Sequence, residues 1–120
     1  MDYTVLGRTG LKVSVMGLGA GGASRIGQGT GRTEAESVAV VRRALDLGVN
    51  FVDTAEAYGN EAIVGRALRE SGRRDVVVST KKSTAVAGRP VTPGELATGL
   101  EGSLERLGVE RVVRARQRGR

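Results

Sequence analysis

Hydrophobic positions along this 120-residue chain fall into two alternating patterns. Short apolar runs, typical of buried strands, lie at residues 13–18, 51–54 and 76–80. Apolar residues at helical spacing occupy residues 34–47, 61–71 and 93–107. A strand is therefore followed by a helix three times in succession, which predicts an α/β fold with a parallel sheet and right-handed crossovers.

Polar residues and glycines mark the ends of the predicted helices. Thr33 with Glu36, and Thr92 with Glu95, have the spacing of a capping box, in which a hydroxyl and a carboxylate each accept a backbone amide proton. Asn60 is a candidate N-cap for the helix between them. Glycine follows each helix, at positions 48, 72 and 108. Such glycines are typical of helix C-termini, so the helix boundaries are well marked.

The formal net charge of +6 is concentrated at the C-terminus. Five of the 19 Lys and Arg residues, and none of the 13 Asp and Glu residues, lie in residues 111–120. We therefore divide the chain into residues 1–110, which carry the fold, and an Arg-rich tail over residues 111–120. A small basic module whose tail contacts nucleic acid is one alternative that this composition leaves open.

Cysteine and histidine are both absent from the chain. We therefore expect neither a disulfide framework nor a metal site. The first residues lack the basic and apolar segments of a signal peptide, and no run approaches the roughly 20 apolar residues of a membrane span. We expect no membrane contact and a cytoplasmic location.

A carboxylate, a phenol and an ammonium follow two neighbouring strands of the predicted sheet. Asp53 lies within the run 51–54, Tyr58 comes five residues later, and Lys81 directly follows the run 76–80. The carboxyl ends of parallel strands share one rim, so we expect Asp53 and Lys81 to form a salt bridge with Tyr58 close by. A lysine cation beside a tyrosine favours the phenolate and eases loss of its proton. The sequence predicts a proton-transfer site at this rim.

The order and spacing of several short motifs resemble the aldo-keto reductases, which reduce aldehydes and ketones with a nicotinamide cofactor on a (β/α)8 barrel. The motifs are Leu6-Gly7-Arg8-Thr9-Gly10-Leu11-Lys12-Val13-Ser14, Gly17-Leu18-Gly19, Asp53, Tyr58-Gly59-Asn60-Glu61, Thr80-Lys81 and Ser103-Leu104-Glu105-Arg106-Leu107-Gly108. A complete barrel takes about 250 residues. The resemblance therefore implies a partial TIM (β/α)8 barrel opened by a hairpin over residues 3–12, an NADP(H) cofactor and a small-molecule carbonyl substrate.

By the same resemblance, Tyr58 protonates the carbonyl oxygen, Lys81 is the cation that assists it, and Asp53 holds Lys81. Lys82 competes with Lys81 for the inward-facing position, because successive side chains of a strand point to opposite faces. The family's Thr-Lys motif favours Lys81. The family's fourth site residue is a histidine after the next strand, and this chain has no histidine. The last barrel strands, which usually build phosphate binding, are also missing, so we expect the chain alone to be inactive.

A glycine-rich segment, Gly17-Leu18-Gly19-Ala20-Gly21-Gly22, matches the Rossmann pattern G-x-G-x-x-G. That mechanism needs a helix to begin at once, near Ala23, whereas the capping box places the helix start at Thr33. A Rossmann-type nucleotide-binding domain is therefore an alternative that the helix start decides. In a barrel the same glycines let the backbone pass beside the cofactor, which makes Gly21, Gly22 and Asp53 the candidates for cofactor binding.

The Arg-rich tail stands where the family continues into a fourth strand, usually an aspartate-leucine-tyrosine type run that leads to the histidine. Residues 111–120 do not resemble such a run. We interpret this ending as the product of a frameshift in a GC-rich coding sequence, with a simple truncation as the alternative. Either origin makes nucleic-acid binding the weaker interpretation of the tail.

Overall fold

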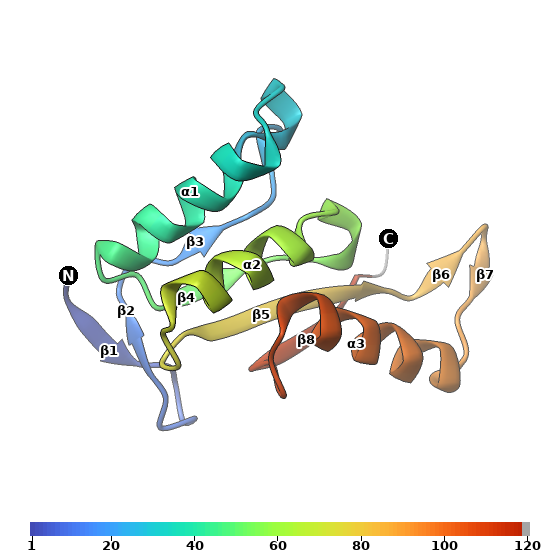
Figure 1. Cartoon of the computed structure of the whole chain (residues 1–120). Coiled ribbons are helices and arrows are strands. Elements are labelled where there is room, and N and C mark those ends of the chain that lie inside the picture. Colours follow the sequence, from blue (N-terminus) through green and yellow to red (C-terminus); the bar gives the residue numbers. More distant parts are fainter. Residues whose placement is uncertain (119–120) are drawn as a thin grey trace.

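Four parallel strands form the central sheet of the protein, which is described by a computed structural model over residues 1–118 (Figure 1). In spatial order these strands are β3 (Leu18–Gly19), β4 (Phe51–Asp53), β5 (Val77–Ser83) and β8 (Arg114–Arg118). Each strand pairs in parallel with the next one along the chain. Spatial order thus equals chain order, as in a (β/α)8 barrel, and the predicted parallel sheet is confirmed.

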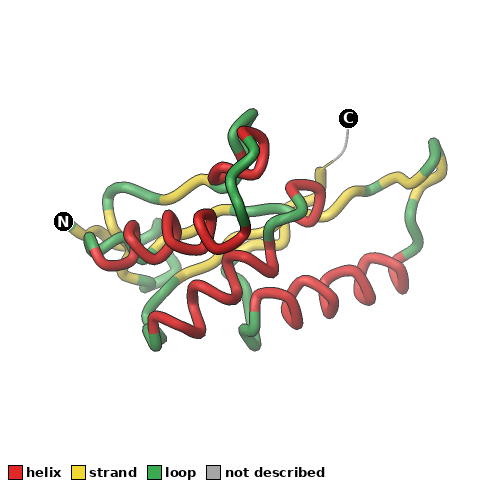
Figure 2. Tube along the Cα trace, turned by 45° about the horizontal axis from the view of Figure 1, so that its top comes forward, coloured by secondary structure: helices red, strands yellow, loops and turns green. Residues whose placement is uncertain are grey.

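Three helices connect the strands and lie together on one side of the sheet (Figure 2). They are α1 (Glu34–Asp46), α2 (Glu61–Ser71) and α3 (Pro93–Leu107). Both predicted capping boxes form, since the Thr33 hydroxyl accepts the amide proton of Glu36 at 3.2 Å and the Thr92 hydroxyl that of Glu95 at 3.1 Å. Within residues 1–118, no helix combines the length and apolar character needed to cross a membrane.

The hydrophobic core lies between these helices and the sheet. Its fully buried members are mostly small or branched side chains, among them Val41, Leu45, Val52, Val64, Ala67 and Leu107. Helices α2 and α3 approach closely at Gly65, where a Cβ atom would collide with the backbone carbonyl of Arg106. A core built from such residues is compact because backbones approach one another, rather than because large side chains fill the space.

The N-terminal hairpin, formed by β1 (Tyr3–Val5) and β2 (Lys12–Ser14), is antiparallel as predicted. The prediction of one strand over residues 13–18 is wrong, because the chain turns between β2 and β3. Two hydrogen bonds fix that turn: the Val15 amide donates to the Asp2 carbonyl at 2.9 Å, and the Ser14 hydroxyl donates to the Met16 carbonyl at 2.6 Å. The apolar run is therefore shared between the hairpin and the sheet.

The predicted glycine-rich loop contains a 3-10 segment, η1 (Arg25–Thr30), whose residues Ile26 and Gly27 depart from helical geometry. Helix α1 begins only at Glu34, so the Rossmann-type alternative, which needs a helix near Ala23, is wrong. A second 3-10 turn, η2 (Glu56–Tyr58), follows β4. The connection after β5 carries a small hairpin of β6 (Ala85–Val86) and β7 (Arg89–Pro90).

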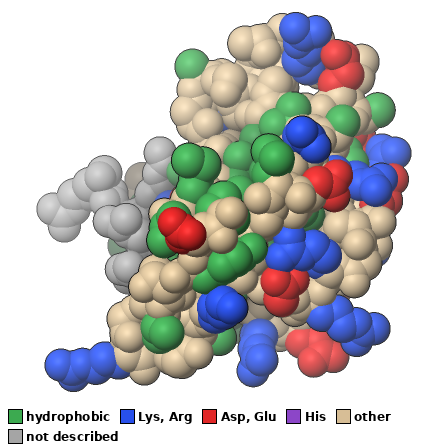
Figure 3. Space-filling view, turned by 90° about the vertical axis from the view of Figure 1, so that its left-hand side faces the viewer, with side chains coloured by type: hydrophobic (Ala, Val, Ile, Leu, Met, Phe, Trp, Pro, Cys, Tyr) green, Lys and Arg blue, Asp and Glu red, His purple; other side chains and the backbone are tan. Residues whose placement is uncertain are grey.

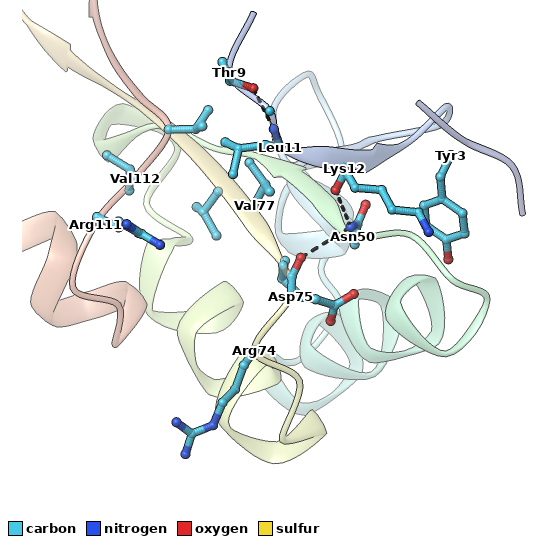
Figure 4. A pocket seen from close by; sticks show the side chains of 14 residues that line it. Tyr3, Thr9, Leu11, Lys12, Asn50, Arg74, Asp75, Val77, Arg111 and Val112 are labelled. Carbon is cyan, nitrogen blue, oxygen red and sulfur yellow. Dashed lines mark hydrogen bonds between the residues drawn. The ribbon is translucent and has the colours of Figure 1, made fainter. Parts of the chain in front are cut away.

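A cavity of about 870 Å³ opens between the N-terminal hairpin, the start of β5 and the segment that precedes β8 (Figure 4). Asn50 ties the hairpin to the residues before β5: its side-chain amide donates to the carbonyls of Lys12 at 2.9 Å and Asp75 at 3.3 Å, and its oxygen accepts from the Ser14 amide at 2.6 Å. This cavity lies at the amino ends of the strands. In a closed barrel that volume is packed core.

Residues 114–118 occupy the fourth strand position, where β8 pairs with β5. The division of the chain at residue 110 and the origin of the tail stay predictions, and Gly119 and Arg120 lie outside the described residues. The sheet therefore has β3 and β8 as its two edges, each paired on one side only within the described chain.

We expect the isolated 120-residue chain to be only marginally folded. Its sheet has two open edges, and large apolar side chains such as Val5, Val15 and Met16 are 55, 63 and 64% exposed. Figure 3 shows hydrophobic side chains gathered on the end of the molecule that carries the hairpin. Size-exclusion chromatography and binding of the dye ANS should reveal aggregates or a loose compact state. A monodisperse chain that unfolds cooperatively and leaves the dye unbound would contradict this expectation.

Candidate active site

The predicted ion pair forms where β4 ends, beside the C-terminal half of β5, which continues past Lys81 to Ser83. Asp53 is the last residue of β4 and lies opposite Ser79 of β5, so Lys81 stands two residues further along. The Lys81 ammonium donates to Oδ2 of Asp53 at 2.6 Å and to the Thr54 carbonyl at 2.9 Å. Its side chain is 14% exposed, against 44% for Asp53. The cation is therefore held on two sides while the carboxylate still faces solvent.

Tyr58 joins this pair from the turn η2. Its ring centroid lies 5.2 Å from the Lys81 Nζ, a distance at which a cation and an aromatic ring attract each other. The turn is short and closed, with the Tyr58 amide bonded to the Ala55 carbonyl at 3.1 Å and Gly59 in the left-handed conformation at φ 71°. That the Tyr58 hydroxyl itself lies beside the amine stays a prediction.

The two glycines predicted to bind cofactor differ in their surroundings. A Cβ atom at Gly21 would lie 2.7 Å from Cζ and 3.0 Å from the hydroxyl oxygen of Tyr58. The absence of a side chain at Gly21 thus makes room for the phenol. Gly22 has a positive φ of 78° and open space where a Cβ would stand, so its backbone remains accessible. That either glycine contacts a cofactor stays a prediction.

Asn60 joins the loop after β3 to the loop after β4, which leads to Tyr58. It is the residue before α2, as predicted, but its side chain does not cap that helix. Instead it donates to the Ala20 carbonyl at 2.7 Å and accepts from the Thr54 hydroxyl at 2.7 Å. The expectation of an Asn60 side-chain cap is therefore wrong, because the fully buried side chain bonds Ala20 and Thr54 instead. The loop after β3 is tied to the loop after β4.

Lys82 faces away from Asp53, toward the helices, as the alternation of strand side chains requires. It is 5% exposed, donates to the Ser103 hydroxyl and lies 3.1 Å from the Glu56 carboxylate. The choice of Lys81 as the residue that pairs with Asp53 is thereby confirmed. Lys82 belongs to a second polar cluster, on the helix side of β5.

The centre of that cluster is Glu61, which is 2% exposed in the first turn of α2. It accepts hydrogen bonds from the Thr80 hydroxyl at 2.6 Å, the Ser103 hydroxyl at 3.0 Å and the Arg106 guanidinium at 2.9 Å. Burial raises the pKa of the Glu61 carboxyl, but these hydrogen bonds and the nearby Lys82 cation together hold it below its ordinary value. Sequence reasoning missed this cluster, although strand alternation would have placed Thr80 and Lys82 on one face.

A second cavity, of about 420 Å³, lies beside Asp53 on the concave face of the sheet. Apolar residues of the hairpin and of the first two barrel strands line most of it, among them Leu6, Val13 and Phe51. An apolar cavity with a few polar groups at its edge is the usual form of a small-molecule site. Among residues 1–118, no group of three or more His, Cys, Asp or Glu side chains is placed to hold a metal ion.

The strands have the parallel order of an α/β barrel segment, and Asp53, Tyr58 and Lys81 lie together near the carboxyl ends of two of them. Comparison with known proteins identifies the class of the chain: the family model described as "Aldo/keto reductase family" matches residues 16–112. The chain belongs to this family.

Several relatives agree with this assignment. Aldo-keto reductase YhdN of Bacillus subtilis is 41% identical over 86 residues, which are 69% of this chain and 26% of the relative. L-galactose dehydrogenase of Arabidopsis thaliana is 36% identical over 118 residues, covering 93% of this chain and 36% of the relative. The holo form of aldo-keto reductase AKR11C1 from Bacillus halodurans superimposes with a TM-score of 0.74 at 28% identity, over 93% of this chain and 38% of that one. The chain thus spans between a quarter and two fifths of each of these proteins.

Proposed function

We propose that the chain forms the proton-transfer part of the active site of an NADP(H)-dependent oxidoreductase that reduces aldehydes and ketones to alcohols. The observation that supports this most is the contact of Lys81 with both Asp53 and the ring of Tyr58. Membership of the aldo/keto reductase family, and the relative that is a sugar dehydrogenase, support oxidoreductase chemistry in general. A cytoplasmic location stays a prediction.

The described residues fit the reactive end of a nicotinamide nucleotide. Asp53 presents a half-exposed carboxylate at the edge of the concave cavity, and the open backbone of Gly22 lies on the loop after β3. These two would contact the cofactor, while Gly21 serves Tyr58. When bound, the cofactor supplies the hydride for the carbonyl carbon. Its phosphates need the last strands of a complete barrel, which this chain does not include.

The chain's own residues would handle the proton. Tyr58 donates its phenolic proton to the carbonyl oxygen as negative charge develops there. Lys81 stabilises the phenolate that results, because its ammonium lies against the ring. Asp53 accepts a hydrogen bond from Lys81 at 2.6 Å and fixes the direction of that ammonium. In the reverse reaction the Tyr58 phenolate would accept the proton of the alcohol, with Lys81 and Asp53 in the same supporting roles.

A chimera tests the function directly. Residues 1–110 joined to the C-terminal part of a complete relative should reduce aldehydes with NADPH, and deuterium carried on the nicotinamide should appear on the carbonyl carbon of the product. The isolated chain, assayed in parallel, should show no turnover because it lacks the phosphate-binding strands. Two outcomes would contradict the proposal: a folded chimera without activity, and brisk turnover by the isolated chain.

A further inference from the structure

Two adjacent lysines of β5 hold opposite sides of the turn η2. Lys81 points into the concave face and contacts the ring of Tyr58, the last residue of η2. Lys82 points to the helix side, where its ammonium lies 3.1 Å from the carboxylate of Glu56, the first residue of η2. The turn that carries the phenol is therefore fixed at both ends by the same strand.

Helix α3 determines where the Lys82 ammonium lies. The side chain is only 5% exposed, and it donates to the Ser103 hydroxyl. A Cβ atom at Gly99 would lie 3.6 Å from the Cδ of Lys82, so the aliphatic stem runs closely along α3. Because its position is set by β5 and α3, this cation provides a fixed point of attachment for the turn, unlike a lysine on the surface.

Glu56 is the link between this fixed cation and the site. Its side chain is 45% exposed, and it also lies 3.6 Å from the Arg106 guanidinium. Glu61, the other acid near Lys82, already bonds Arg106 at 2.9 Å and two hydroxyls. Arg106 thus balances the charge of Glu61, and at 3.1 Å the Lys82 contact with Glu56 is the shorter of the two ion pairs that reach the turn.

We propose that Lys82 is a positioning residue for Tyr58 and acts on it through Glu56. The proposal deepens the proposed function and rests on it, since it assumes that the phenol of Tyr58 must be held against Lys81. Loss of the Lys82 cation would leave η2 attached to β5 only on the concave side, and the Tyr58 ring would move away from the Lys81 ammonium.

The experiment uses the full chain, in which Tyr3 and Tyr58 are the two tyrosines. A Tyr3→Phe background labelled with 3-fluorotyrosine reports on Tyr58 alone by ¹⁹F NMR, in about 1 M trimethylamine N-oxide to favour the compact state. Lys81→Met should shift the resonance, because the cation over the ring is removed. Lys82→Met and Glu56→Gln should each move it in the same direction as Lys81→Met. The double variant should add nothing further, since both residues act along one path.

Lys12→Met is the matched control, since Lys12 lies in the N-terminal hairpin and contacts residue 3, the other tyrosine position. It should leave the resonance unchanged. If the resonance shifts in Lys81→Met but not in Lys82→Met, the positioning role of Lys82 is wrong and the proposed site still stands. Additive shifts in the double variant overturn the path through Glu56. If the resonance does not shift in Lys81→Met, the proposed site is wrong, and the positioning role of Lys82 is wrong as well.

Discussion

Replacing Tyr58 with Phe is expected to lower the rate of carbonyl reduction by about 10²- to 10⁴-fold in a chimera of residues 1–110 with the C-terminal part of a complete relative. The substitution keeps the ring against Lys81 and removes only the hydroxyl, so the proton donor is lost while the packing remains. Single-turnover measurements with saturating NADPH would show the loss in the chemical step, with little change in cofactor affinity.

Tyr3→Phe is the natural control for that experiment. Tyr3 lies in the hairpin and donates its hydroxyl proton to the Gly48 carbonyl at 2.8 Å, so its loss affects a hairpin contact and leaves the site intact. The rate should stay within about twofold of the parent, as expected for a change that touches no reacting group. A chimera equally active with Phe at position 58 would remove Tyr58 from the mechanism and with it the proposed role of Lys81.

Features governed by local rules were predictable from the sequence. The capping boxes at Thr33 and Thr92 depend on contacts three residues apart, and both form. The period of a strand predicts that only one of Lys81 and Lys82 faces the site, and the shared rim of parallel strands predicts the ion pair with Asp53. The choice of Lys81 needed more than spacing, because it came from the resemblance to the family's Thr-Lys motif.

Features that depend on distant partners were not predictable. Asn60 precedes a helix as a cap would, yet its amide binds Ala20 and Thr54 because the β3 and β4 loops meet there. Glu61 looks like an ordinary acid of a first helical turn, and its burial depends on two hydroxyls and Arg106 from other elements. The role of Gly21 depends on the Tyr58 ring, 37 residues away in the sequence. The spacing of residues along the chain does not reveal which distant residues come into contact in the fold.

Replacing Glu61 with Ala in the same chimera is expected to lower the free energy of unfolding by about 3–5 kcal/mol. The carboxylate is 2% exposed, and its removal deprives the Arg106 guanidinium of its partner at 2.9 Å and the Thr80 and Ser103 hydroxyls of their acceptor. Urea denaturation followed by circular dichroism measures the loss. Glu101→Ala, at an exposed position of α3, is the control and should change the free energy by less than about 0.5 kcal/mol.

The pH dependence of stability separates the charge of Glu61 from its shape. Because the pKa of this carboxyl is lower in the folded state than its ordinary value of 4.5, its contribution is complete above pH 4.5 and is lost as the pH falls through the folded-state pKa. Glu61→Gln keeps the shape and cannot ionise. The difference in unfolding free energy between the parent chimera and this variant should therefore be constant near neutral pH and shrink progressively below pH 4.5. A difference that stays constant down to pH 2.5, roughly two units below the ordinary value, would show that the carboxylate charge contributes nothing and that only packing around Glu61 stabilises the α2 to α3 contact.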